Sequence, residues 1–309
     1  MAKYILQKDL PDVKAGAEGV INEIGVLCFY ESLGTPEYFF PKGSYENKPE
    51  WFKLKEVISC KLYGQLGNQM FQYAATIATA LKYNLPYCVP KHTLNDKVWK
   101  PYYFEGVNYC DEKLSDATIW KEPSHAYHEI PKPEGNLILD GYMQSYKYSQ
   151  DYLPEIRKAF GFEFYDSKAE CTFIHVRRGD YLKYPLHHPV VTVQYLTEAM
   201  KISEEKGVTH FSCFSDDIEW VKKNINKEKF PEYTFEYSDG NSEMIDLKLM
   251  VCCKNAIISN STFSWWAAYL NNNPNKIVIT PDESNWFGPN NKHLDVKDLL
   301  PENWLRIKY

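Results

Sequence analysis

Residues 172–180 read TFIHVRRGD, an apolar run that ends in two arginines, a glycine and an aspartate. The apolar part predicts a buried strand, and its polar continuation would then lie at the carboxyl end of that strand. In open α/β sheets, ligands bind outside the carboxyl ends of the strands. This stretch therefore predicts a parallel α/β sheet and also the position of a ligand site.

The chain from residue 57 onward alternates between apolar runs and helical stretches, which is typical of α/β proteins. The turn at 64–67 leads into a run whose apolar residues recur at helical spacing. We expect two doubly wound, Rossmann-type lobes that split near residue 165, with a ligand between them. The expected strands are 57–62, 137–139, 172–176, 210–214, 256–258 and 276–279, and the expected helices are about 68–81, 149–160, 192–206, 217–224, 243–253 and 262–271.

Residues 1–55 differ from the rest, because glycines and prolines interrupt short apolar or aromatic runs, as at Gly16, Gly19 and Gly34-Thr35-Pro36. This punctuation predicts hairpins and a small β module. No residue cluster assigns the module a function, and we interpret it as an accessory or docking unit. The expected domains are therefore 1–55, an N-terminal lobe at 56–165 and a C-terminal lobe at 166–309.

Composition restricts the class of function. A formal net charge of -6 argues against a protein that covers nucleic-acid phosphates, so any phosphate contact must be local. We find no secretion signal and no apolar run of the roughly 18 residues that cross a bilayer. The expectation is a cytoplasmic protein, either free or peripherally attached to the inner membrane, with no transmembrane segment.

Arg177 and Arg178 are candidate phosphate ligands. A guanidinium binds phosphate oxygens with two parallel hydrogen bonds and keeps its charge, so it can stabilise a diphosphate that leaves a sugar. The alternative is a surface ion pair with Asp180, which would be the better interpretation of a single arginine. The whole cluster at a strand end favours the functional interpretation. Gly179 would allow a sharp turn or a close approach to a ligand.

A second anion site is predicted where Ser261 and Thr262 open a helix, since hydroxyls and free backbone N–H groups would point the same way. The alternative is a plain helix cap, and Trp265-Trp266 is better interpreted as core. Asp246 lies in an apolar helix that we expect to be nearly buried. Its carboxylate would suit the paired N–H donors of guanine, although pairing with Lys254 or another cation fits equally well.

The turn GQLGNQ at 64–69 only loosely resembles a phosphate-binding loop, because it lacks the required spacing and lysine, so we interpret it as a loop that closely approaches a donor from the opposite lobe. The amides of Asn68 and Gln69 could hydrogen-bond a donor phosphate or sugar. Helix capping explains Asn68 almost as well.

No metal site is expected. Asp216-Asp217 follows a strand, where an aspartate pair is commonly a helix cap and a first-turn acid, and the chain contains no Asp-X-Asp. Metal-dependent sugar transferases usually need such a pair to hold an ion on the diphosphate, so arginine would replace the metal. For the general base, Asp180, His188 and no base at all stay open, and a structural role for His188 is an alternative.

Four ordered motifs together resemble glycosyltransferase family 11, the α-1,2-fucosyltransferases: GQLGNQMFQYA at 64–74, HVRRGDY at 175–181, FSDD at 214–217 and NSTFSWWAA at 260–268. The resemblance runs from about residue 57 to the C-terminus and leaves out residues 1–55. It implies a GT-B-like fold, GDP-β-L-fucose as donor, inversion at the anomeric carbon, and no metal or other cofactor. The missing N-terminal anchor indicates a bacterial member.

The resemblance also implies roles at matching motif positions. Arg177 would hold the β-phosphate with support from Arg178, and His175 and Asp246 would read guanine and ribose. Asn68 would face the donor from the N-terminal lobe, while Ser261, Thr262 and Phe263 would line the diphosphate seat.

The hypothesis at this stage is transfer of fucose to the 2-hydroxyl of a terminal galactose, on an oligosaccharide or a lipid-linked glycan. The alternatives are another fucosyl linkage, another GDP-sugar, or a glycan- or nucleotide-binding protein without turnover.

Overall fold

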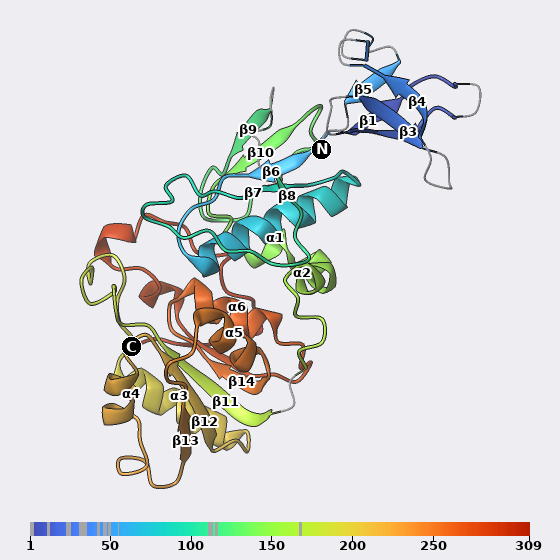
Figure 1. The fold of residues 1–309 in the computed structure, drawn as a ribbon. Coiled ribbons are helices and arrows are strands. Elements are labelled where there is room, and N and C mark those ends of the chain that lie inside the picture. Colours follow the sequence, from blue (N-terminus) through green and yellow to red (C-terminus); the bar gives the residue numbers. More distant parts are fainter. Residues whose placement is uncertain are drawn as a thin grey trace.

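The computed structural model describes residues 3–309 except 11–12, 23–25, 31–35, 42–43, 46–47, 49–50, 55, 111–113, 115–116 and 167–168. Its principal sheets follow one another along the chain, at 3–54, 58–140 and 169–307 (Figure 1). The predicted boundaries at residues 55 and 165 lie between these sheets. The fold is α/β and GT-B-like, with two Rossmann-type lobes and a small N-terminal β module, as predicted.

The N-terminal module is an antiparallel sheet in the order β4-β3-β2-β1-β5. Its separate small core is formed by Leu6, Val13, Leu27, Phe29 and Tyr45. The predicted turn at Gly16 lies between the first two strands, where its φ of 94° favours glycine. The turn predicted at Gly19 is wrong, because this glycine lies within β2. Gly34 and Thr35 of the remaining predicted turn lie outside the described residues. The strands are β1 (Lys3–Leu6), β2 (Glu18–Ile21), β3 (Leu27–Tyr30), β4 (Pro36–Phe40) and β5 (Phe52–Leu54).

The N-terminal lobe has a parallel sheet in which β10 lies between β6 and β9. A parallel bridge between Ile58 and Tyr87 links this sheet to the short parallel pair β7 and β8. The strands are β6 (Ile58–Cys60), β7 (Val89–Pro90), β8 (Tyr109–Cys110), β9 (Thr118–Lys121) and β10 (Leu137–Asp140), and the α-helices are α1 (Leu66–Tyr83) and α2 (Leu153–Ala159).

The C-terminal lobe is a six-stranded parallel sheet in the order β13-β12-β11-β14-β15-β16. Numbered from its first strand, this is the order 3-2-1-4-5-6 of a Rossmann fold, and the chain reverses direction of winding between β11 and β14. Its strands are β11 (Ala169–Val176), β12 (His210–Ser215), β13 (Thr234–Tyr237), β14 (Cys253–Ile257), β15 (Val278–Pro281) and β16 (Leu305–Ile307), and its α-helices are α3 (Val193–Glu205), α4 (Ile218–Asn224), α5 (Glu243–Val251) and α6 (Thr262–Leu270).

All strands and helices expected after residue 57 are present, with ends displaced by a few residues. The strands that were not predicted are β7, β8, β9, β13 and β16, of which β7 and β8 have only two residues each. Each of the other three lies at the edge of its sheet and is partly exposed, so it lacks the continuous apolar run that marks the buried strands.

The two lobes are joined by α1 and α6, which pack against each other (Figure 1). The ring of Phe71 in α1 lies 4.4 Å from that of Trp265 and 5.0 Å from that of Trp266, and all three side chains are buried. The prediction that the two tryptophans belong to the core is confirmed. This shared apolar core therefore holds α1 and α6 in a fixed position relative to each other, and so positions their N-termini.

Candidate active site

A cavity of about 1120 Å³ lies between the lobes, beyond the carboxyl ends of the neighbouring strands β11 and β14, where the winding of the sheet reverses. This is the switch point at which open α/β sheets bind ligands. The cavity is also large for a single small ligand, since such pockets usually hold about 300–1,000 Å³. Of the predicted site residues, those that line it are Asn68, His175, Arg177, Asp180, His188, Asp246, Ser261, Thr262 and Phe263.

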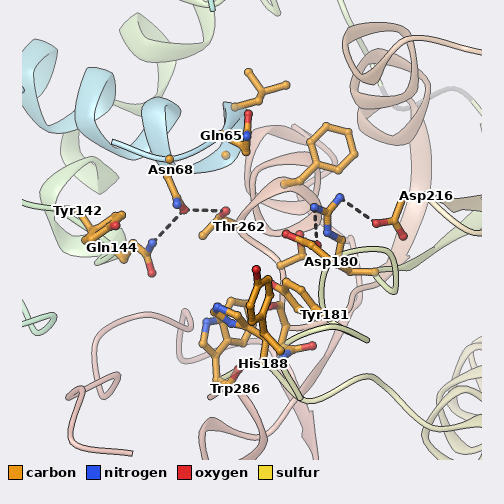
Figure 2. Close-up of a pocket in the computed structure, with 18 of the residues that line it drawn as sticks. Gln65, Asn68, Tyr142, Gln144, Asp180, Tyr181, His188, Asp216, Thr262 and Trp286 are labelled. Atoms are coloured by element: carbon orange, nitrogen blue, oxygen red, sulfur yellow. Dashed lines mark hydrogen bonds and ion pairs between the residues drawn. The ribbon is translucent and has the colours of Figure 1, made fainter. Parts of the chain in front are cut away.

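The N-termini of α1 and α6 meet at this cavity. Oδ1 of Asn68 accepts hydrogen bonds from Nε2 of Gln144 and from the hydroxyl of Thr262, both at 3.0 Å (Figure 2). A Cβ added to Gly67 would lie 2.5 Å from the backbone carbon of Thr262, so the helices approach as closely as a glycine permits. The predicted approach of the loop 64–69 to a donor ligand stays a prediction, and its observed close contact is with the first residues of α6. Because helix N-termini carry partial positive charge, their convergence creates an anion-binding region.

Arg177 lies in the cavity between two carboxylates. Its Nη1 is 3.0 Å from Oδ2 of Asp216 and its Nη2 is 2.8 Å from Oδ1 of Asp180 (Figure 2). The ring of Tyr181 lies below the guanidinium, 5.7 Å from its carbon. The sequence left two interpretations of Arg177 open, an ion pair with Asp180 and a position in the ligand cleft. Both occur in the structure.

Arg178 points away from the cavity. Its Nε is 2.9 Å from Oδ2 of Asp217, and its guanidinium lies 4.1 Å from the centre of the Trp220 ring. Asp217 also caps α4, as predicted for this aspartate pair, whereas Asp216 pairs with Arg177 and is not a first-turn acid. The donor-binding role of Arg178 stays a prediction, and its direct contacts are with the protein.

The two histidines differ in environment. Burial lowers the pKa of His175 to about 3, with a smaller effect of Arg177 in the same direction, so its imidazole is neutral. Its Nδ1 lies 3.1 Å from the hydroxyl of Ser259, which ties the end of β11 to the end of β14. His188 stacks on Tyr181 with ring centres 4.7 Å apart, and burial lowers its pKa as well.

Asp246 faces the cavity from α5 and accepts a 2.5 Å hydrogen bond from the hydroxyl of Ser238. The alternative partner Lys254 is wrong, because Lys254 forms an ion pair with Glu170 at 2.5 Å. The expectation of a nearly buried helix is also wrong, since Ile245 and Leu249 are about half exposed on its outer face. Asp246 therefore keeps acceptor capacity that a ligand could use.

Gln69 does not line the cavity. Its side chain is buried, donates to the carbonyls of Gly64 and Lys100, and accepts from the N–H of Tyr102. Its own N–H donates to the carbonyl of Gln65 within the first turn of α1. The predicted donor contact of Gln69 stays a prediction, and the observed contacts indicate that it shapes the loop.

Asn260 has a structural role. Its side-chain amide is buried and donates to the carbonyls of Pro189 and Trp286, both at 2.9 Å. The side chain of Asn260 therefore fixes two loops that border the cavity.

The N-terminal lobe contributes a wall that the sequence analysis did not name. Its lining residues include Trp99, His125, Tyr142 and Gln144. Tyr142 and Gln144 directly follow β10, so the rule that located the arginines at the end of β11 would also have located them. Trp99 lies on an irregular loop with no periodic pattern.

Two negative findings apply to the described residues. They contain no group of three or more histidine, cysteine, aspartate or glutamate side chains suited to hold a metal ion. No helix among them has the length and apolar character that crossing a membrane requires.

Arg177 and the N-termini of α1 and α6 thus border one inter-lobe cleft at the switch point of the C-terminal sheet, in a GT-B-like fold. The chain belongs to glycosyl transferase family 11, whose family model matches residues 118–307.

Similar proteins include an alpha-1,2-colitosyltransferase from Escherichia coli, which is 27% identical over 82% of this chain and 99% of its own length. A galactoside alpha-(1,2)-fucosyltransferase 1 from Ateles belzebuth is 27% identical over 67% of this chain and 63% of its own length. Among solved structures, POFUT1 in complex with GDP-fucose aligns over 70% of this chain and 93% of that chain, with 12% identity and a TM-score of 0.41.

Proposed function

We propose that the protein transfers L-fucose, with inversion, from GDP-β-L-fucose to the 2-hydroxyl of a terminal galactose. The observation that carries the proposal is Arg177 beside the converging N-termini of α1 and α6. These groups concentrate positive charge where the diphosphate would lie, in a cavity whose other charged lining groups are carboxylates. Membership of a family with fucosyltransferase members supports the choice of donor.

The donor would lie along the C-terminal lobe. Asp246 would accept hydrogen bonds from the guanine N–H groups, and neutral His175 would contact the nucleoside beside it. The diphosphate would lie over Ser261, Thr262 and Phe263, with Asn68 facing it from α1. To bind it, Arg177 would exchange at least one of its two carboxylate partners for a phosphate oxygen.

The reaction exchanges one bond at C1 of fucose for another. The acceptor oxygen attacks C1 from the face opposite to the diphosphate, and the C1–O bond breaks as GDP leaves with its electron pair. Arg177 and the helix N-termini stabilise the charge that develops on GDP, so the proposal needs no metal or other cofactor. The attack from the opposite face converts the β-linked donor into an α-linked product.

His188 is our choice of base for the proton of the acceptor hydroxyl. It lines the cavity, is neutral because burial lowers its pKa, and stacks on the tyrosine that lies beneath Arg177. Asp180 is the other candidate, but its carboxylate already pairs with Arg177 at 2.8 Å.

A second donor deserves a test because the colitosyltransferase resembles this chain over nearly its full length. Colitose is fucose without its 3-hydroxyl. A site that hydrogen-bonds this hydroxyl would discriminate strongly against the deoxy sugar, whereas an apolar site would not. Parallel assays with GDP-fucose and GDP-colitose would decide between the donors.

The deciding experiment incubates the purified protein with GDP-fucose and lactose, measures GDP release, and determines the linkage in the product. We expect GDP release that depends on lactose and an α-1,2-linked trisaccharide. Binding of GDP-fucose without release would favour a non-catalytic binding protein, and a different linkage would correct the acceptor position.

A further inference from the structure

A continuous line of aromatic rings crosses the cleft from the N-terminal lobe to Arg177. Adjacent ring centres along it are 4.7–6.2 Å apart, and the guanidinium carbon of Arg177 lies 5.7 Å from the last ring. In order, the rings belong to Trp99, Tyr63, Tyr142, His125, Phe287, His188 and Tyr181.

Except for Tyr63, all of these rings line the cavity. Tyr63 instead supports the line, because its ring contacts those of both Trp99 and Tyr142. Figure 2 shows Tyr142 on the side of Asn68 and Gln144, apart from Tyr181 and His188. The line thus extends from the reacting region into a part of the cleft formed by the N-terminal lobe.

The rings on the N-terminal side are held in place by polar contacts beneath them. The hydroxyl of Tyr63 donates to Asp140, which also pairs with Lys61 at 2.6 Å. Although burial opposes the change, these two hydrogen bonds lower the pKa of Asp140 and keep it ionised. The N–H of Tyr142 donates to Oε2 of Glu122 at 2.8 Å. Rings fixed in this way offer a preorganised surface, which lowers the entropic cost of binding.

The chemistry of this surface fits a sugar ring. A pyranose has one face of C–H groups, which packs on an aromatic ring, and an edge of hydroxyls that hydrogen-bond to neighbouring polar groups. Gln144 and His125 provide such groups beside Tyr142. A nucleoside diphosphate would instead require positive charge, and in this part of the cleft the lining residues are mainly aromatic.

We propose that Tyr142 and Trp99 form an acceptor subsite for the sugar next to the one that is modified. The proposal rests on the function proposed above and adds that the enzyme prefers an oligosaccharide to a monosaccharide. The modified sugar would lie beside His188 and Tyr181, and the second sugar would stack on Tyr142 with Trp99 beyond it.

The test compares lactose with methyl β-D-galactoside as acceptors for Tyr142→Ala, Tyr142→Phe and Trp99→Ala. Tyr142→Ala should raise the KM for lactose about tenfold, equivalent to about 1.4 kcal/mol of binding, and leave the KM for the monosaccharide nearly unchanged. Trp99→Ala should also raise the KM for lactose. Tyr142→Phe should keep a KM for lactose close to the wild-type value, because it keeps the ring. Equal losses for both acceptors, or no loss for lactose, would overturn the subsite.

Tyr103→Ala is the matched control, since Tyr103 is an exposed aromatic that does not line the cavity. The KM for GDP-fucose and its slow hydrolysis without acceptor should stay at wild-type values in every variant, which shows that the fold and donor site are intact.

Should the wild type transfer no sugar, the proposed function fails, and the subsite is tested alone by saturation-transfer NMR of lactose with GDP present. Lactose binding that is lost in Tyr142→Ala supports the subsite. Binding retained in that variant, or absent from the wild type, overturns it.

Discussion

Arg177 and Asp216 emerge side by side from neighbouring parallel strands, because Val176 at the end of β11 pairs with Ser215 at the end of β12. The register of the sheet therefore places the guanidinium within 3.0 Å of the carboxylate. Asp216 is itself fixed by a 2.8 Å hydrogen bond from the N–H of Arg178. The arginine that we propose for catalysis is thus aimed into the cleft by the backbone geometry of the lobe.

The first prediction concerns the charge of Arg177. Arg177→Ala should lower kcat for transfer from GDP-fucose by about two to three orders of magnitude, as expected for loss of one donor to a developing negative charge. Steady-state assays with lactose would measure this. Arg306→Ala is a control, since Arg306 pairs with Glu283 and does not line the cavity. Near-normal turnover by Arg177→Ala would exclude the proposed mechanism.

The second prediction concerns Gly179, whose added Cβ would lie 2.5 Å from Oδ2 of Asp216. Gly179→Ala should displace Asp216 and release Arg177 from its position, lowering kcat/KM by about tenfold, or about 1.4 kcal/mol of transition-state stabilisation. Gly135→Ala is a matched control, because its Cβ would meet no atom within 4 Å. Equal activity of the two variants would show that Asp216 does not position Arg177.

The third prediction concerns metals. If Arg177 and the two helix N-termini stabilise the leaving diphosphate, excess EDTA should leave the rate unchanged, and added Mn²⁺ or Mg²⁺ should not raise it. The measurement is the initial rate of GDP release after dialysis against the chelator. A rate that collapses with EDTA and returns with Mn²⁺ would contradict the proposal.

The strand ends were predictable because the buried strands are continuous apolar runs, and a polar residue after such a run lies at the ligand-binding edge. This reasoning found His175, Arg177 and Ser261. It could not give the partners of those side chains, since the contact of Arg177 with Asp216 depends on strand register. Nor could it separate Arg177 from Arg178, because which arginine faces the cleft depends on how the chain turns after β11.

The acceptor wall was harder to predict than the donor side. Trp99 reaches the cleft from an irregular loop, and the line of rings joins residues from both lobes. Aromatic residues in the sequence are equally compatible with a core, as Trp265 and Trp266 show. Only the tertiary packing distinguishes a ring that lines a cavity from one that fills a core.

The fourth prediction concerns the proposed base. Because burial lowers the pKa of His188, the neutral form that accepts a proton persists below the usual range of a histidine. The rate should therefore fall on the acid side with a midpoint below about 6.5, the ordinary histidine pKa, and His188→Ala should lose this limb. His92→Ala, at an exposed histidine, is the control. An acid limb that persists in His188→Ala and vanishes in Asp180→Asn would assign the base to Asp180.

The last prediction links His175 to stability. Burial lowers its pKa in the folded protein to about 3, while the unfolded chain has the ordinary value of about 6.5. Between these two values the unfolded state binds more protons than the folded state, so the free energy of unfolding must decrease as the pH falls. Above about 6.5 both states carry a neutral imidazole and this contribution is constant.

His175→Gln removes this titration and keeps a side chain that can hydrogen-bond the hydroxyl of Ser259. Urea denaturation at several pH values would give the free energy of unfolding of both proteins. The difference between wild type and variant should be constant above about pH 6.5 and shift in favour of the variant below it. A difference that does not vary between pH 7 and pH 4 would show that His175 titrates with the same pKa in the folded protein and in the unfolded chain, which would contradict the lowered pKa.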